Sequence, residues 1–127
     1  MSSLKEITEA LLSSVTLALD ATGATDLYTV PVGKRCIITK AIVVVGADPV
    51  DCTVSIGSSG TTATKFLAAQ TIHTNVDTQY EAAILQPIPS ATTAASWAFA
   101  AGDVIQATVA GGGGGASNTI FLFGILY

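Results

Sequence analysis

The sequence predicts an all-β protein, an antiparallel β-sandwich or barrel formed by one domain. Its length of 127 residues suits a single domain with its own core. After the first dozen residues, short runs of strand-forming residues alternate with turn signals at the spacing typical of sandwiches and barrels. Strands do not alternate with long helical patterns, so a parallel sheet is not expected.

Most strands are indicated by β-branched and aromatic residues between turn formers. The predicted strands are residues 14–19, 27–30, 35–45, 51–56, 80–85, 97–99, 104–109 and 119–127. Residues 64–71 are compatible with a strand or a short helix, because their centre lacks β-branched residues. Residues 30–33 suit a β-turn with Pro31 at its second position. The glycine run 111–115 lacks the features of a phosphate-binding loop and is predicted to be a hairpin tip.

The N-terminus carries the only helical pattern. Ser3 and Glu6 fit a capping box, and Leu4, Ile7 and Leu11 recur at helical spacing. The sequence therefore predicts a helical arm over residues 1–13 and a sandwich domain over residues 14–127. So short a helix is marginal alone. Either Leu4, Ile7 and Leu11 dock on another molecule, or the helix packs across one end of its own sandwich.

The composition favours a protein that is buried against other chains. Half of the residues are hydrophobic and 11% are charged, so much of the surface must be neutral and partly apolar. The net charge is −4, and Lys34-Arg35 is the densest basic cluster, which disfavours nucleic-acid binding. The apolar runs are far too short to span a bilayer, so no membrane partner is expected.

The last strand has apolar residues on both sides, although a solvent-facing sandwich strand should be polar on one side. One side carries Ile120, Leu122 and Leu126. The other side forms a candidate subunit interface of Phe121, Phe123, Ile125 and Tyr127. The alternative is that the N-terminal helix or a loop of the same chain covers this side.

Catalytic residues, metal ligands and cofactor-binding residues are not expected. His73 is a lone histidine without partners at metal-ligand spacing, and no serine lies in a nucleophile elbow. Asp48 and Asp51 flank a turn, where turn formation explains them better than calcium binding does. The sequence therefore predicts a protein that is not an enzyme.

Cys36, Cys52 and Trp97 are predicted to be buried, with both cysteines reduced. Cys36 and Cys52 flank a turn at residues 48–49. A simple hairpin about this turn would leave the two cysteines about 30 Å apart along the strand.

Two stretches resemble small structural proteins of tailed-phage virions, of the decoration or cement type. The first is residues 27–44, with the phrase YTVPVGK, and the second is residues 101–109, followed by the glycine-rich tip and the apolar strand that ends at Tyr127. The resemblance covers most of residues 28–127. It lies in turn phrases, so it carries over no single functional residue.

The resemblance implies a jelly-roll-like sandwich that oligomerises, with a trimer favoured, and that stabilises a head shell. Its partners would be further copies of itself and the major capsid protein. Its location would be the capsid surface, after synthesis in the host cytoplasm, because Glu6 stands where a signal peptide needs basic residues. The alternatives are a tail, fibre or host-adhesion component and a carbohydrate-binding sandwich module.

Overall fold

The computed structural model describes residues 9–19, 22–46, 52–59, 66–72, 81–86, 98–111 and 118–127. Within these residues every regular element is a β-strand. The strands are β1 (Ala10–Leu17), β2 (Gly23–Thr29), β3 (Cys36–Val44), β4 (Cys52–Ser58), β5 (Leu67–Thr71), β6 (Ala82–Leu85), β7 (Ala98–Phe99), β8 (Val104–Gly111) and β9 (Asn118–Leu126).

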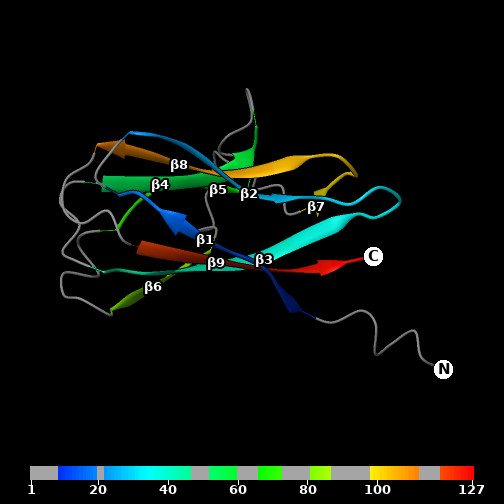
Figure 1. Cartoon of the computed structure of the whole chain (residues 1–127), viewed down its shortest axis with the longest axis horizontal. Helices are drawn as coiled ribbons and strands as arrows, with labels where there is room; N and C mark the ends of the chain where they lie inside the picture. The colour runs from blue at the N-terminus through cyan, green and yellow to red at the C-terminus, as the bar shows by residue number, and fades with distance from the viewer. Residues whose placement is uncertain are drawn as a thin grey trace, which may run out of the picture.

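The strands form two antiparallel sheets that pack face to face (Figure 1). The five-stranded sheet has the order β1-β9-β3-β6, with the short β7 also paired to β3, and the four-stranded sheet has the order β2-β8-β4-β5. Consecutive strands mostly lie in different sheets, and β4 and β5 pair with each other as neighbours in the chain. This order is that of a jelly roll, which confirms the predicted fold class.

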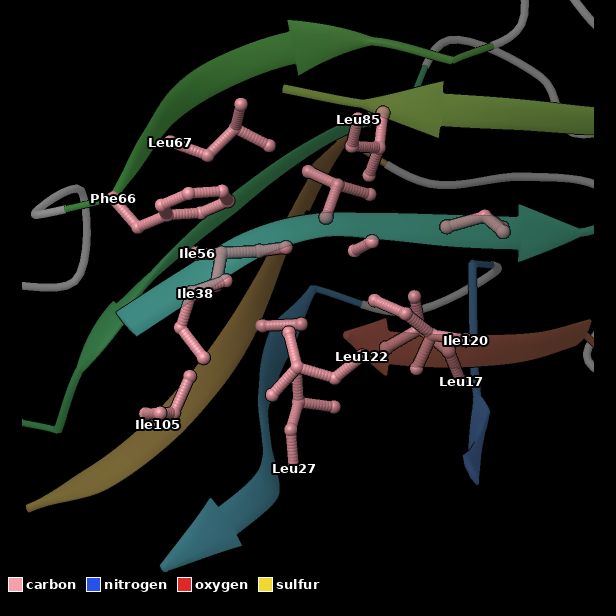
Figure 2. Close-up of a cluster of buried hydrophobic side chains, with 14 of the residues drawn as sticks. Leu17, Leu27, Ile38, Ile56, Phe66, Leu67, Leu85, Ile105, Ile120 and Leu122 are labelled. Atoms are coloured by element: carbon pink, nitrogen blue, oxygen red, sulfur yellow. The ribbon is translucent and has the colours of Figure 1, made fainter. Parts of the chain in front are cut away.

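The core lies between the sheets, where alternate residues of each strand point inward. Figure 2 shows Leu17, Leu27, Ile105 and Leu122 directed into this layer from four different strands. The largest fully buried side chains are Phe66, Phe99, Leu17, Leu19, Ile38, Ile56, Leu67, Ile72, Ile105, Ile120, Leu122 and Val30.

Both cysteines are fully buried thiols, as predicted. Burial raises the pKa of the Cys36 thiol to about 11, so little of it is thiolate at neutral pH.

Strand β9 holds the five-stranded sheet together because it pairs with β1 on one side and β3 on the other. At its start, the buried Asn118 side chain donates from Nδ2 to the Leu17 carbonyl oxygen at 3.2 Å. Its Oδ1 accepts from the Gly46 backbone N–H at 3.0 Å. One amide thus joins the end of β1 and the residues after β3 to the same strand, and the burial of Asn118 is compensated by hydrogen bonds.

Two β-bulges lie beside the C-terminal half of β9, one in β1 and one in β3. In β1 the register shifts between Leu11 and Ser13, and in β3 it shifts between Ile38 and Lys40. Each bulge inserts one residue and reverses which residues face the core. In β3 the extra residue is Thr39, so that Lys40 turns outward while Ala41 and Val43 are buried.

The structure differs from the sequence interpretation in the N-terminal helix, the domain boundary and the hairpins. The N-terminal helix does not extend over residues 10–12, which lie in β1; residues 1–8 lie outside the described part of the chain. Strand β1 also continues across the domain boundary predicted after Ser13. The hairpin predicted at the glycine run does not form, because β8 and β9 belong to different sheets. The simple hairpin about residues 48–49 that was considered for the two cysteines does not form either, because β3 and β4 also belong to different sheets.

The structure also corrects the predicted turn at Pro31 and resolves the ambiguous segment around residues 67–71. The turn before β3 spans Pro31 to Lys34, with the Lys34 N–H donating to the Pro31 oxygen at 3.2 Å. Gly33 takes the position that needs a positive φ, at 79°, so Pro31 stands first in the turn and not second. The ambiguous segment around residues 67–71 is a strand. Trp97 lies outside the described residues.

We expect Gly124→Ala to destabilise the fold. A Cβ at Gly124 would lie 2.5 Å from the Ile37 carbonyl oxygen and 2.8 Å from Leu12 Cδ1, between the two bulges. Overpacking of this kind costs about 1–3 kcal/mol. Thermal unfolding followed by circular dichroism should show a lower Tm. Gly23→Ala is the matched control, since a Cβ there meets no atom within 4 Å. Equal Tm values for the two variants would contradict the close packing at Gly124.

Candidate interaction surface

The outer side of the five-stranded sheet carries a continuous apolar surface, called the apolar face below. Its position follows from the strand alternation, because the neighbours of these residues in β3, β6 and β9 are buried in the core. Its members are Leu11, Ile37, Ile42, Val44, Ile84, Phe121, Phe123 and Ile125.

The strand register aligns these side chains in rows across the sheet. One row runs from Ile84 in β6 through Ile42 in β3 to Phe121 in β9, with Ser14 of β1 at its end. The exposed fraction is 64% for Ile84, which stands at the β6 edge, whereas Ile42 and Phe121 are half-buried by their neighbours. Side chains directly opposite each other on adjacent strands are in contact range, so the row is one apolar strip.

A second row contains the charged groups of the apolar face. Phe123 lies between Leu11 of β1 and Lys40 of β3. The Lys40 Nζ lies 5.1 Å from the centre of the Phe123 ring and 3.1 Å from Glu9 Oε1. The Thr39 hydroxyl and Lys40 lower the pKa of the Glu9 carboxyl, so this carboxyl is ionised at neutral pH. The lysine is therefore matched by a carboxylate and by an aromatic face.

The outer side of the four-stranded sheet is different in character and is called the hydroxyl face below. Thr53 of β4 pairs with Thr71 of β5, and Ser55 of β4 pairs with Thr108 of β8. The Gln106 side chain donates to the Asp26 carboxylate on the same side. Apart from Ser55, which is buried, these side chains are at least partly exposed and can form hydrogen bonds with water, so this face is compatible with solvent. The two faces of one sandwich therefore offer opposite surfaces.

The structure brings part of the predicted subunit interface together. Phe121, Phe123 and Ile125 are adjacent on the apolar face, as the alternation predicted. Tyr127 lies past the end of β9, with 46% of it exposed, and its backbone exchanges hydrogen bonds with Arg35.

Of the predicted docking residues, Leu11 lies at the β1 edge of the apolar face with 52% exposure. Leu4 and Ile7 lie outside the described residues.

Ile42 and Ile84, which belong to the apolar face, and Lys40, which lies beside Phe123, were not predicted from the sequence. The run of Ile and Val in residues 37–45 indicated a strand apolar on both sides, which was the available signal for Ile42. The bulge at Thr39 decides which of its sides faces outward, and nothing local in the sequence marks that bulge. For Ile84, the signal was its alternation with Ala83 and Leu85, which are both buried.

Within the described residues, no group of three or more His, Cys, Asp or Glu side chains is placed to hold a metal ion. His73, Asp48 and Asp51 lie outside those residues. The described segments also contain no helix with the length and hydrophobicity that crossing a membrane requires.

Comparisons with known proteins give a fold likeness. No family model matches the chain, and no curated protein does. A chain in the structure "Capsid of Ralstonia phage GP4" is 18% identical, with 94% of this chain and 83% of that chain covered and a TM-score of 0.57. A chain in "Cyanophage Pam1 capsid asymmetric unit" is 17% identical, with 94% and 84% covered and a TM-score of 0.45. At such identities, the first likeness establishes that the two chains share a fold.

Proposed function

We propose that this chain is a non-enzymatic structural protein of a bacteriophage virion that associates with itself and with the major capsid protein. More specifically, we propose a decoration or cement protein on the head surface, made in the host cytoplasm and assembled as a closed ring, with a trimer favoured. The observation that carries the proposal is the apolar face on one side of the sandwich and the hydroxyl face on the other.

Leaving the apolar face in water is unfavourable. Apolar surface removed from water contributes about 25 cal/mol per Å², so a contiguous set of Ile and Phe side chains favours contact with another protein. The hydroxyl face has no such cost. A subunit with one face of each kind can be buried on one side and solvated on the other, as a component attached to a larger particle must be.

The fold likeness supports the same proposal from an independent direction. The chain of TM-score 0.57 belongs to a structure described as the capsid of a Ralstonia phage. A jelly roll hosts many functions, so fold alone is a weak argument. It gains force here because the apolar face supplies the contact surface that a capsid component needs.

The direct test of the proposed function is the protein composition of purified particles of the phage that encodes this chain. We expect quantitative mass spectrometry to find the chain in intact particles in copy numbers comparable to those of the major capsid protein. Far lower copy numbers, comparable to those of tail components, would instead support the tail or fibre alternative. Complete absence from particles would contradict a virion role.

A charge on the apolar face should prevent attachment. We expect Ile84→Lys to reduce the amount of chain that binds to particles lacking it by more than about tenfold, because a lysine charge in a contact of the apolar face, with another copy or with the capsid, would be buried without a partner. Ile84 is exposed in the isolated subunit, so the Tm should stay unchanged.

Thr71→Lys is the matched control for this experiment. Thr71 is also exposed and also lies on an edge strand, but on the hydroxyl face. We expect it to bind particles as the unchanged chain does. Equal binding by the Ile84→Lys and Thr71→Lys variants would show that the apolar face is not the contact surface.

A further inference from the structure

The size of the apolar face indicates what kind of partner covers it. The face spans four strands, or about 14 Å at the usual strand spacing, and about 20 Å along β9 from Thr119 to Ile125. Its projected area is therefore on the order of 300 Å², whereas each partner in a standard protein interface buries about 800 Å². A short chain segment matches this area better than the whole side of another folded subunit.

The described start of β1 shows where the preceding segment, residues 1–8, joins the domain. Ala10 pairs with Gly124, and β1 runs antiparallel to β9, so the chain before Ala10 arrives from the direction of Ile125 and Tyr127. Figure 1 shows this start of β1 at the margin of the sandwich, toward the side that carries the C-terminus. The chain thus enters β1 at the Ile125 end of the apolar face.

The Glu9–Lys40 ion pair lies at this entry into β1. Glu9 precedes β1, and Lys40 lies in β3, two strands away across β9. Lys40 Nζ lies 5.1 Å from the centre of the Phe123 ring and contacts Glu9 Oε1 at 3.1 Å. Because β1 runs antiparallel to β9, the chain would have to reverse direction before Glu9 for residues 1–8 to cover their own apolar face. This direction of entry therefore favours a neighbouring subunit as the destination.

The chemistry of residues 1–8 matches the apolar face. The segment spans about 26 Å when extended, which exceeds the length of the face. It carries two large apolar residues, Leu4 and Ile7, and its Lys5 and Glu6 side chains cancel in charge. The charges on the face, Lys40 and Glu9, are already paired with each other. An electrically neutral segment would therefore meet a face on which the lysine is already compensated.

We propose that residues 1–8 of one copy bind the apolar face of a neighbouring copy, with Leu4 and Ile7 as the contacting side chains. The predicted docking arm and the predicted subunit interface are then the two halves of one contact. Such a contact is heterologous, and it closes into a ring when the rotation between copies permits. The inference rests on the self-association in the proposed function and does not depend on a virion location.

A mixing experiment tests this contact. One variant lacks residues 1–8 and keeps Glu9, so it has an apolar face and no arm. A second variant carries Leu11→Lys and Ile84→Lys, so it has an arm and a disrupted face; both residues are exposed in the subunit. We expect each variant alone to be monomeric by native mass spectrometry. An equimolar mixture should form a complex of one copy of each.

Other results of the mixing experiment would overturn the proposal. An arm-deleted variant that keeps the oligomeric state of the intact chain shows that the arm is not the occupant. A mixture that stays monomeric shows that arm and face are not partners. Both results leave the virion role intact, which is tested separately by the composition of particles.

A substitution variant tests the same contact in case the deletion variant misfolds. Leu4→Asp with Ile7→Asp keeps the chain length and should give the same monomer and the same complex in the mixture. Its matched control is Ser2→Asp with Thr8→Asp, which adds the same charge at polar positions and should remain oligomeric. Dissociation by this control to the same extent would overturn the role of the two apolar side chains.

Discussion

The position of β9 between β1 and β3 is the constraint on which the rest of the structure depends. The last strand of the chain completes the backbone hydrogen bonding of the first and the third, and the side chain of the buried Asn118 anchors its start with two hydrogen bonds. Gly124 lets Leu12 and the Ile37 carbonyl approach its backbone between two bulges. Because these contacts join distant parts of the chain, the five-stranded sheet cannot be completed until the C-terminal strand is in place.

The same constraint creates the apolar face. With the bulge at Thr39, β3 presents Ala41 and Val43 to the core and turns Ile42 outward beside Phe121 of β9. The sheet is thereby apolar on both sides at its centre, which a solvated sheet would not be. The opposite sheet places hydroxyl groups outside and apolar residues inside. Core packing and surface chemistry are thus two consequences of one strand register, and the surface chemistry favours a subunit of a larger assembly.

Much of the fold could be predicted from local sequence, and its long-range parts could not. Alternation and turn residues gave the strands and the outward side of Phe121 and Phe123. The helix predicted from Leu4, Ile7 and Leu11 is wrong at Leu11, because pairing with β9 outweighs a weak helical spacing. The hairpins failed because a turn signal does not say whether the chain returns to the same sheet. The position of Ile42 on the apolar face depends on the bulge at Thr39, which no local sequence pattern marks.

If the apolar face is a contact between protein chains, the intact chain associates in solution. Sedimentation equilibrium at micromolar concentration measures this association. We expect a whole-number multiple of the 12.8 kDa chain mass, constant over a range of concentrations. A single species of one chain mass, with no tendency to associate as the concentration rises, would contradict it.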